Sequence, residues 1–262
     1  MIAIDVGKTI RINRFFRTNK ALLVPIDDSF IAGPEGGLED ISHLISCIDS
    51  SDATGIMMTY GSYIRNYDII QNTPCLLNVS ASTVLSNHTR KVLVQDVLEA
   101  LKVGFSGVAC HINLSSKYES EMLKIAAEIG AQCRELSVPF MIISYPRKEM
   151  PDGFDCNYTG LSIQEYTKMI KHCVRVAVEL GADMIKTHYT GTADSFREVI
   201  RSAEGVPVLV SGSSMMNLDA LIEKVYGAIS AGASGVCFGR NVFNSPDPQK
   251  TIKAISNAIW NC

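Results

Sequence analysis

Short apolar runs alternate along the chain with longer segments in which apolar residues recur at helical spacing. Eight of these runs are bounded by turn residues and predict strands; they cover residues 21–26, 53–58, 74–79, 105–112, 138–144, 182–187, 206–211 and 233–239. They lack a clean alternation of apolar and polar positions, which is typical of parallel strands buried on both faces. The pattern therefore predicts a buried parallel sheet.

The intervening segments predict helices, most clearly at 118–136, 162–181 and 218–232. In the second of these segments one stripe contains Ile163, Tyr166, Ile170, Cys173, Val174 and Ala177. A stripe of this kind is expected to pack on a core while the charged side chains lie largely opposite. Strand and helix alternate over the whole chain, which indicates an α/β fold.

Eight strand–helix units fill the 262 residues without a compositional break or a linker. Because α/β barrels of about 250 residues form one domain, this length favours a single-domain (β/α)8 TIM barrel over two domains. The alternative is an open doubly wound sheet, which commonly carries a G-x-G-x-x-G fingerprint, and the sequence contains none. Residues 1–20 are expected to form an N-terminal extension that caps the barrel.

Composition and charge narrow the class of protein. Apolar residues make up 47% of the chain and charged residues 19%, so a large core is available and disorder is excluded. The net charge of -3 gives no basic footprint for nucleic acid or an anionic membrane. The N-terminus is interrupted by charge, and no apolar run is long enough to span a membrane. We therefore expect a cytoplasmic protein.

The cysteines and histidines give no sign of a metal or another cofactor. The eight cysteines are widely spaced and form no C-x-x-C pair, so we expect reduced thiols rather than a zinc site or a disulfide framework. His43, His88 and His172 are predicted to lie on surface helices or loops. No convergent set of His, Asp and Glu is marked by its spacing.

In such a barrel the chemistry lies at the C-terminal ends of the strands. Lys186 is the most informative residue there, because alternation along its strand puts it on the same face as Ala182 and Met184. A lysine in the mouth of an apolar barrel loses hydration, which disfavours its charged form and frees the amine as a nucleophile. The alternative is a rim lysine that forms a salt bridge with a neighbouring carboxylate.

Tyr145 and Asp27 shift this balance towards catalysis. Tyr145 shares a face with Ile143, and Asp27 shares a face with Pro25, so both polar groups can point inward at the same end as Lys186. Schiff-base chemistry uses an amine that attacks a carbonyl, a phenol that carries a proton and a carboxylate that assists dehydration. Taken alone, the tyrosine fits a packed aromatic somewhat better than a catalytic group, and the aspartate similarly fits a turn residue or a helix cap. Together at one barrel end they favour imine chemistry.

The ends of the last two strands predict a phosphate site. The candidates are Ser211, Gly212, Ser213, Gly239 and Arg240. Glycine lets backbone amides approach an anion, serine donates hydrogen bonds and arginine binds phosphate bidentately. The alternative is that both glycines serve tight turns and the arginine lies on the rim.

Four further residues are candidates for supporting roles at this end, namely Asp28, His111, His188 and Arg147. The segment 146–160 is long for a strand-to-helix connection. It is predicted either to fold over the pocket as a lid or to form a surface excursion.

Five stretches resemble a known family. They are PIDD (25–28), SYPR (144–147), ADMIKTHYTG (182–191), VSGSS (210–214) and GVCFGRNVF (235–243). They are similar to the archaeal-type class I aldolases of the DeoC/LacD group, which includes fructose-bisphosphate aldolases, aminodideoxyheptulosonate synthases and an autoinducer-processing thiolase. The resemblance implies Lys186 as the Schiff-base lysine, Tyr145 as acid and base, and Asp27 as the supporting carboxylate. It also implies phosphate binding by the last two strand-end loops and a homo-oligomer, commonly a decamer.

Three positions depart from the family pattern. The usual Asp-His after the first strand is Asp27-Asp28, and the tryptophan found in some fructose-bisphosphate aldolases is Ile143. The loop after the seventh strand usually reads Gly-Gly-Pro-Lys, whereas Met215 stands here at the position of the phosphate-binding lysine. The expected chemistry is preserved, and the departures bear on the substrate and on phosphate affinity.

The sequence therefore predicts a class I aldolase that acts on a small sugar phosphate, first of all fructose 1,6-bisphosphate, cleaved to dihydroxyacetone phosphate and glyceraldehyde 3-phosphate. One alternative is a heptulosonate-type synthase, or another aldolase or thiolase of the same group. A second alternative is a non-catalytic barrel that binds a sugar phosphate as a sensor. A metal-dependent aldolase is disfavoured because no ligand cluster is present.

Overall fold

A computed structural model describes residues 5–150, 155–156, 158, 160–212 and 214–261 of the chain. Its centre is a closed barrel of eight parallel strands. These strands are β1 (Ala21–Pro25), β2 (Gly55–Met58), β3 (Cys75–Asn78), β6 (Gly107–Leu114), β7 (Phe140–Pro146), β10 (Met184–Thr187), β11 (Val208–Ser211) and β12 (Gly235–Cys237). They follow one another around the barrel in chain order, and β12 pairs with β1 to close it. The predicted single-domain (β/α)8 barrel is confirmed.

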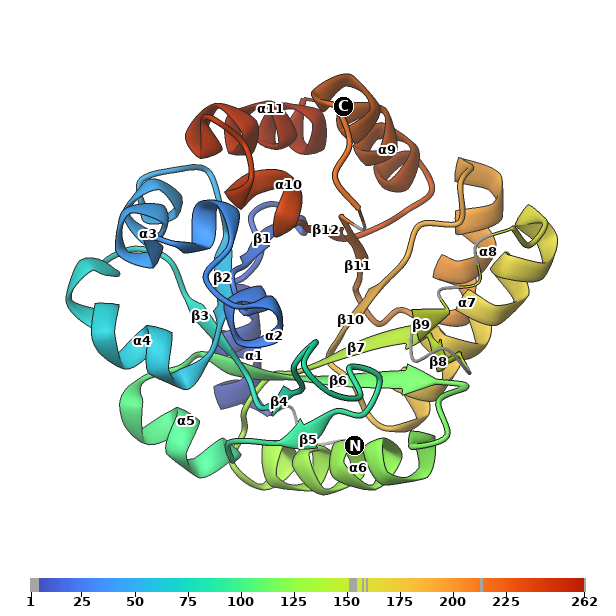
Figure 1. The fold of residues 1–262 in the computed structure, drawn as a ribbon, viewed down its shortest axis with the longest axis horizontal. Coiled ribbons are helices and arrows are strands. Elements are labelled where there is room, and N and C mark those ends of the chain that lie inside the picture. The colour runs from blue at the N-terminus through green and yellow to red at the C-terminus, as the bar shows by residue number, and fades with distance from the viewer. Residues whose placement is uncertain (1–4, 151–154, 157, 159, 213, 262) are drawn as a thin grey trace.

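Helices form a ring around these strands (Figure 1). The helices of the ring are α3 (Ile41–Asp49), α4 (Tyr60–Asn66), α5 (Val97–Val103), α6 (Glu119–Glu135), α7 (Ile163–Glu179), α8 (Ala193–Ser202), α9 (Leu218–Ser230) and α11 (Pro248–Trp260). Further helical pieces are α1 (Val6–Asn13), α2 (Asp28–Ala32), α10 (Arg240–Phe243), η1 (Gly36–Leu38) and η2 (Tyr67–Ile69). None of the helices in the described part of the chain is both long enough and apolar enough to cross a membrane.

Local signals in the sequence start several helices. At the start of α7, Ser162 and Glu165 form a capping box, in which each side chain binds the other residue's backbone N–H. The helix α11 begins with Pro248 behind the Asp247 cap, and proline suits the first helical turn because its missing N–H has no partner there. These caps fix where each helix leaves its loop.

The strands separate two cores. Alternate residues point into the barrel, where they form an inner cluster of Phe15, Ala21, Leu23, Met57, Leu76, Ala109, Met141, Ile143, Tyr145, Met184, Leu209 and Cys237. The residues between them, such as Ile142 and Ile185, face outward and pack against the helices. Both faces are buried, which is why the strand runs show no polar alternation.

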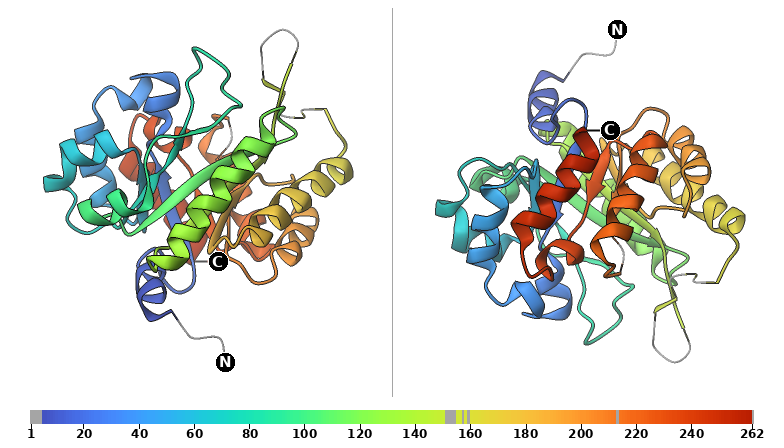
Figure 2. Two further views of the ribbon diagram at one scale, coloured as in Figure 1. Left: turned by 90° about the horizontal axis from the view of Figure 1, so that it is seen from below. Right: turned by 90° about the horizontal axis from the view of Figure 1, so that it is seen from above.

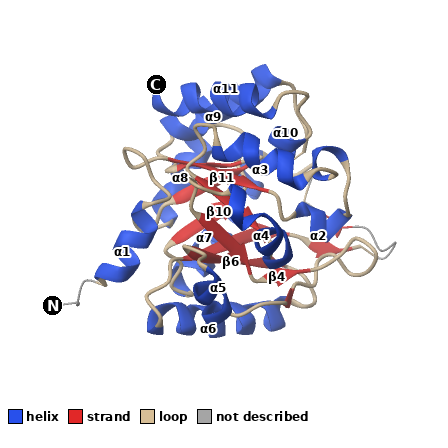
Figure 3. Cartoon of the chain, turned by 90° about the vertical axis from the view of Figure 1, so that its left-hand side faces the viewer, coloured by secondary structure: helices blue, strands red, loops and turns tan. Residues whose placement is uncertain are grey.

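The N-terminal segment lies at one end of the barrel and α2 lies at the other (Figure 3). Phe15 is fully buried in the inner cluster, and Ile12 and Phe16 pack against it. A Cβ added to Gly55 would lie 2.8 Å from the Phe15 ring, so the glycine makes room for the aromatic side chain. An aromatic plug therefore fills this end of the barrel interior.

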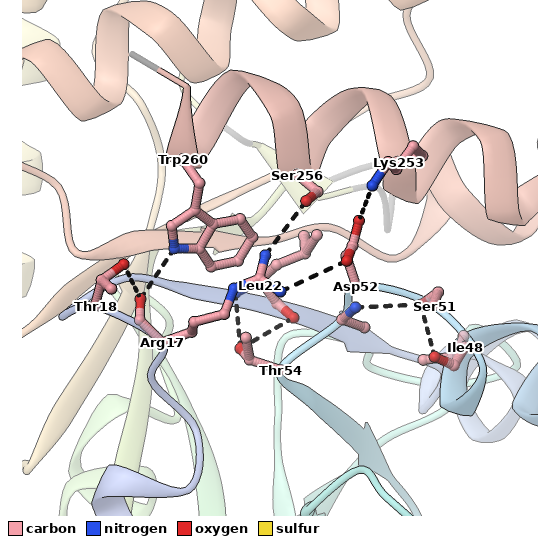
Figure 4. A network of polar contacts seen from close by, with 11 residues as sticks. Arg17, Thr18, Leu22, Ile48, Ser51, Asp52, Thr54, Lys253, Ser256 and Trp260 are labelled. Atoms are coloured by element: carbon pink, nitrogen blue, oxygen red, sulfur yellow. Dashed lines mark hydrogen bonds and ion pairs between the residues drawn. The ribbon is translucent and has the colours of Figure 1, made fainter.

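The Phe15 end of the barrel is joined to α11 by a polar clasp made of Arg17, Asp52, Lys253 and Trp260 (Figure 4). Arg17 lies over the Trp260 ring at 3.7 Å from its centroid, and the Trp260 indole donates to the Arg17 carbonyl at 2.9 Å. Asp52 accepts from Lys253 at 2.9 Å and lies 3.5 Å from the Arg17 guanidinium. These contacts connect the N-terminal segment, the loop before β2 and α11.

Two small hairpins lie at the end opposite to α1 (Figure 2). One pairs β4 (Ser80–Ala81) with β5 (Val92–Leu93), and the other pairs β8 (Lys148–Glu149) with β9 (Asp155–Cys156). The second hairpin occupies the long segment 146–160, and part of that segment lies outside the described residues. Glu149 ties its start to the first hairpin, because the carboxylate accepts hydrogen bonds from Thr89 and from Ser116.

Candidate active site

A cavity of about 340 Å³ lies at the C-terminal ends of the barrel strands. The predicted residues that line it are Asp27, Asp28, His111, Tyr145, Arg147, Lys186, His188, Ser211, Gly212, Gly239 and Arg240. Ser213, which was also predicted, lies outside the described residues. The fold thus brings candidates from six strand ends into one pocket, because all parallel strands of a barrel end on the same face.

Lys186 points inward from β10, two residues after Met184, and is only 8% exposed. Burial lowers the pKa of its ammonium group, but the acidic side chains around it raise this pKa by more. The anions among them are the carboxylates Asp27 and Asp28, since burial raises the pKa values of Cys237 and Tyr145 and keeps both protonated. The expectation that burial would hold the amine neutral is therefore wrong. The resting lysine is an ammonium, and a base must take its proton before the nitrogen can attack a carbonyl.

Asp27 is the buried carboxylate of the pocket, at the start of α2. Burial raises its pKa, and the neighbouring Asp28 adds to the increase, whereas Lys186 and Asn78 oppose it. Asn78 donates to the Asp27 carboxylate at 2.6 Å and accepts from the Ser80 backbone at 3.1 Å. A carboxylate with a raised pKa accepts a proton readily, and the asparagine fixes its orientation.

Sequence reasoning missed Asn78, although the signal was present. Asn78 follows the inward-facing Leu76 by two residues at the end of β3, so alternation along the strand turns it into the barrel.

Asp28 is more exposed and pairs with Arg240. Its carboxylate lies 3.6 Å from the Arg240 Nε, and both side chains are partly open to solvent. The second aspartate after β1 therefore holds the arginine at the rim of the pocket.

Tyr145 lies at the centre of a row of three rings. It points inward from β7, meets His111 edge to face at 5.0 Å between centroids, and stacks on His188 at 4.1 Å. Burial raises the pKa of its phenol, and the nearby Lys186 cation lowers it. The phenol is therefore protonated at neutral pH, and a positive charge on the Lys186 nitrogen favours its ionisation.

Both histidines of this row are neutral. Burial, together with nearby cations, lowers the pKa of His188 to about 3 and holds that of His111 well below its ordinary value. The Nδ1 atom of His188 is 2.6 Å from the Tyr166 hydroxyl on α7. His111 Nε2 is buried and has no hydrogen-bond partner among the described residues, so it is open to a ligand in the pocket.

The loop after β11 is held by two side chains from outside the pocket. Asn241 accepts from the Met216 backbone at 3.0 Å and donates to the Ser214 carbonyl at 3.3 Å. Lys224 donates to the Gly212 carbonyl at 3.2 Å, and burial lowers its pKa to about 8. Lys224 was not singled out from the sequence because it belongs to the middle of α9, where spacing gives no hint of the pocket.

The two candidate anion loops differ in what their residues offer. Ser211 Oγ is buried and has no partner among the described residues, so it can donate to a ligand. A Cβ on Gly239 would lie 2.6 Å from the Pro25 carbonyl, so packing against β1 is sufficient to require glycine there. Gly239 therefore gives no independent support for an anion site, whereas Ser211 and Arg240 do.

His88 was predicted to lie on the surface and instead lines the pocket. Arg147 donates to its Nε2 at 2.9 Å, and burial with nearby cations lowers its pKa to about 3. Lys91, buried in the same segment, donates to Ser82 at 2.6 Å. The hairpin β4–β5 carries this segment over the barrel mouth, which the local sequence did not reveal. His43 and His172 are exposed, as predicted.

Within the described ranges, no group of three or more His, Cys, Asp or Glu side chains could hold a metal ion. The arrangement instead combines a buried lysine, a carboxylate with a raised pKa and a protonated phenol. Such a set can form an imine and move protons around it.

Comparison with known proteins agrees with this chemistry. The profile of the DeoC/LacD family aldolases matches residues 21–245. The 2-amino-3,7-dideoxy-D-threo-hept-6-ulosonate synthase of Halobacterium salinarum is 30% identical over 97% of this chain and 92% of its own length. The 2-amino-4,5-dihydroxy-6-oxo-7-(phosphonooxy)heptanoate synthase of Streptomyces griseus is 31% identical over 97% of this chain and 91% of its own length.

A solved structure of a Schiff-base-forming fructose-1,6-bisphosphate aldolase superimposes with a TM-score of 0.85. It is 26% identical and covers 97% of this chain and 100% of that one. The chain therefore belongs to the DeoC/LacD family of aldolases, as a lyase of the class I type.

Proposed function

We propose that Lys186 forms an imine with the ketone carbon of a phosphorylated ketose, and that the enzyme breaks or forms the neighbouring C–C bond. Fructose 1,6-bisphosphate is the first candidate, cleaved to dihydroxyacetone phosphate and glyceraldehyde 3-phosphate. The observation that carries the proposal is the meeting of Lys186, Asp27 and Tyr145 in one buried pocket.

Asp27 is proposed to take the proton of the Lys186 ammonium. The raised pKa of this carboxylate makes the transfer feasible within the pocket. The free amine attacks the ketone carbon, the carbinolamine loses water with Asp27 returning its proton, and a positively charged iminium remains.

Tyr145 is proposed to pass its phenol proton to Asp27, which is a carboxylate again after the dehydration. The resulting phenolate accepts the proton of the hydroxyl group on the carbon that becomes the aldehyde. The electron pair of the breaking C–C bond moves into the iminium and gives an enamine. The positive nitrogen of the iminium lowers the pKa of the Tyr145 phenol, as the Lys186 cation does. The tyrosine then gives this proton to the enamine carbon and recovers its own proton from Asp27, and hydrolysis frees Lys186.

The phosphate of the ketone half is proposed to bind at Ser211, Gly212, Ser213, Gly239 and Arg240. Ser211 supplies a buried free hydroxyl and Arg240 a cation at the rim. Lys224 supports this loop through the Gly212 carbonyl.

Reductive trapping tests the proposal. The protein is treated with dihydroxyacetone phosphate and sodium borohydride, and peptides are mapped by mass spectrometry. Lys91 and Lys224 are built-in controls. Lys91 is buried, and the lowered pKa of the half-buried Lys224 leaves a larger fraction of its amine neutral and nucleophilic. We expect the reduced adduct on Lys186 alone. An adduct on either of the other lysines, or none, overturns the proposal.

A synthase that joins a phosphorylated ketone donor to an amino-acid semialdehyde is the second candidate. It is favoured by the names of the relatives that are 30% and 31% identical over nearly the whole chain. Parallel assays of fructose 1,6-bisphosphate cleavage and of condensation between dihydroxyacetone phosphate and aspartate semialdehyde separate the two. The reaction with the larger kcat/KM identifies the physiological class of aldehyde.

A further inference from the structure

Tyr166 on α7 is partly buried against the helix-facing core, and its hydroxyl forms a hydrogen bond with a residue of the pocket. The hydroxyl reaches His188 Nδ1 at 2.6 Å, and the His188 ring stacks on Tyr145 with 18° between the planes. A continuous row therefore runs from α7 through His188 to the phenol beside Lys186.

Neither member of the Tyr166–His188 bond is charged. Burial raises the pKa of the Tyr166 phenol, so it keeps its proton. Burial and the cations Arg147, Lys224, Lys186 and Arg240 lower the pKa of His188 to about 3, so its imidazole carries one proton. The position of that proton depends on which partner donates.

The contacts of the hydroxyl favour the tyrosine as the donor. Either group can donate in this bond, and His188 Nδ1 is the one hydrogen-bond partner of the Tyr166 hydroxyl among the described residues. If the hydroxyl accepted instead, its own hydrogen would have no acceptor among the described residues. With Tyr166 donating, Nδ1 accepts and the proton of His188 lies on Nε2.

We infer that Tyr166 holds His188 as the Nε2–H tautomer, and that this N–H donates to the oxygen of the aldehyde carbon during C–C bond making and breaking. His188 lines the pocket beside Tyr145, and with Nδ1 occupied its remaining ring nitrogen is the one available to a ligand. The inference rests on the proposed aldolase reaction. It assigns His188 a catalytic contact and makes Tyr166 a positioning residue.

A neutral imidazole suits this role. The aldehyde oxygen gains negative charge as the enamine attacks, and a fixed donor in a buried site stabilises that charge. Because the donor is neutral, it stabilises the oxygen without competing with Tyr145 for proton transfer. Tyr145 then moves the proton while His188 holds the oxygen.

The tautomer is measured without substrate. The full-length protein is labelled with ¹⁵N-histidine, and the ring nitrogens of His188 are assigned through the signals lost in His188→Phe. We expect a protonated Nε2 and an unprotonated Nδ1 at neutral pH in the wild type, and a mixture of tautomers in Tyr166→Phe. Tyr63→Phe is the matched control, since Tyr63 is also half-buried on a helix and packs on Phe105, on the other side of the barrel (Figure 1). A protonated Nδ1 in the wild type, or an unchanged spectrum in Tyr166→Phe, overturns the inference.

Kinetics test the contact with the aldehyde oxygen. His188→Phe keeps an aromatic ring next to Tyr145 and removes the donor, so kcat should fall roughly 10²- to 10³-fold. His188→Gln places an N–H near the position of Nε2 and should recover part of this loss. Tyr166→Phe should lower kcat about tenfold, since it removes one orienting hydrogen bond, while Tyr63→Phe leaves it unchanged.

The trapping experiment separates this inference from the proposed function. His188→Phe should still give the reduced adduct of dihydroxyacetone phosphate on Lys186, because the donor acts on the other half of the substrate. If the wild type gives no adduct, the proposed function fails, whatever the histidine spectrum shows. If the wild type gives the adduct and His188→Phe turns over at the wild-type rate, the inference fails alone.

Discussion

The two ends of the barrel are built on the same strands and hold opposite kinds of side chain. At the end near α1, Phe15 fills the interior among aliphatic residues. At the other end the inward positions carry Lys186, Tyr145 and Asn78. Along β10 the change takes two residues, from Met184 to Lys186. Buried apolar groups stabilise a fold, whereas buried ionisable groups cost stability, so one end supports the fold and the other performs chemistry.

Lys186→Met should have the largest effect, because it removes activity at the pocket end of the barrel without lowering stability. The change removes the amine that forms the imine and should lower kcat by about 10⁴-fold or more. Methionine fills a similar volume without a buried charge, so the melting temperature should stay the same or rise. Turnover and calorimetry on the same preparation measure both effects. Substantial residual turnover with an unchanged mechanism would show that another amine does the chemistry.

Phe15→Ala should show the opposite result, a loss of stability with little change in activity. It leaves a cavity in the apolar end of the barrel and should lower the free energy of unfolding by about 3–5 kcal/mol. The kcat of the folded protein should change little, because the pocket lies at the far end. Urea denaturation measures the free energy of unfolding, and initial rates measure kcat. A large loss of kcat in fully folded Phe15→Ala would mean that the two ends are coupled.

The pH dependence of imine formation should test the proton transfer from Lys186 to Asp27 at the pocket end of the barrel. The pKa of Lys186 is raised, so the lysine is an ammonium at neutral pH and depends on Asp27 to accept its proton. Internal transfer conserves the number of bound protons, so the wild-type rate should be nearly flat between about pH 6 and about pH 8.

In Asp27→Asn the proton must leave to solvent. The rate should then rise about tenfold per pH unit below the pKa of Lys186, and at neutral pH it should lie below the wild-type rate. Stopped-flow mixing with dihydroxyacetone phosphate and borohydride quenching gives both profiles. Parallel pH–rate profiles in the wild type and in Asp27→Asn would show that Asp27 does not accept the proton.

Arg17→Met should have the smallest effect. It removes the cation over Trp260 and the ion pair with Asp52, both of which are partly exposed. The expected loss is about 1 kcal/mol in the free energy of unfolding, with no change in kcat. Thermal melts at two salt concentrations measure this loss. Salt weakens the ion pair between Arg17 and Asp52 but does not weaken the packing of the Arg17 methylene groups on Trp260. A loss of several kcal/mol would mean that the clasp, rather than the Phe15 plug, stabilises this end.

Strand residues of the site could be predicted from the sequence. Asp27, His111, Tyr145 and Lys186 belong to strands or strand ends, and alternation with a period of two decides which side they face. The barrel rule then brings strand ends together without any knowledge of the helices. Lys224, Tyr166 and His88 come from helices or a hairpin segment, and their distance to the pocket depends on packing that no local pattern encodes.

The sequence by itself determined the fold, which strand residues face inward and the main reactive groups at the strand ends, because these follow from local periodicity and chain topology. Only the tertiary structure decided the protonation of those groups. The Lys186 pKa depends on burial and on the carboxylates of Asp27 and Asp28 at the start of α2. The neutral state of His188 depends on burial and on cations that include Arg147, Lys224 and Arg240 from three other segments. Electrostatic interactions act between residues that are far apart in the chain, so their balance exists only in the folded protein.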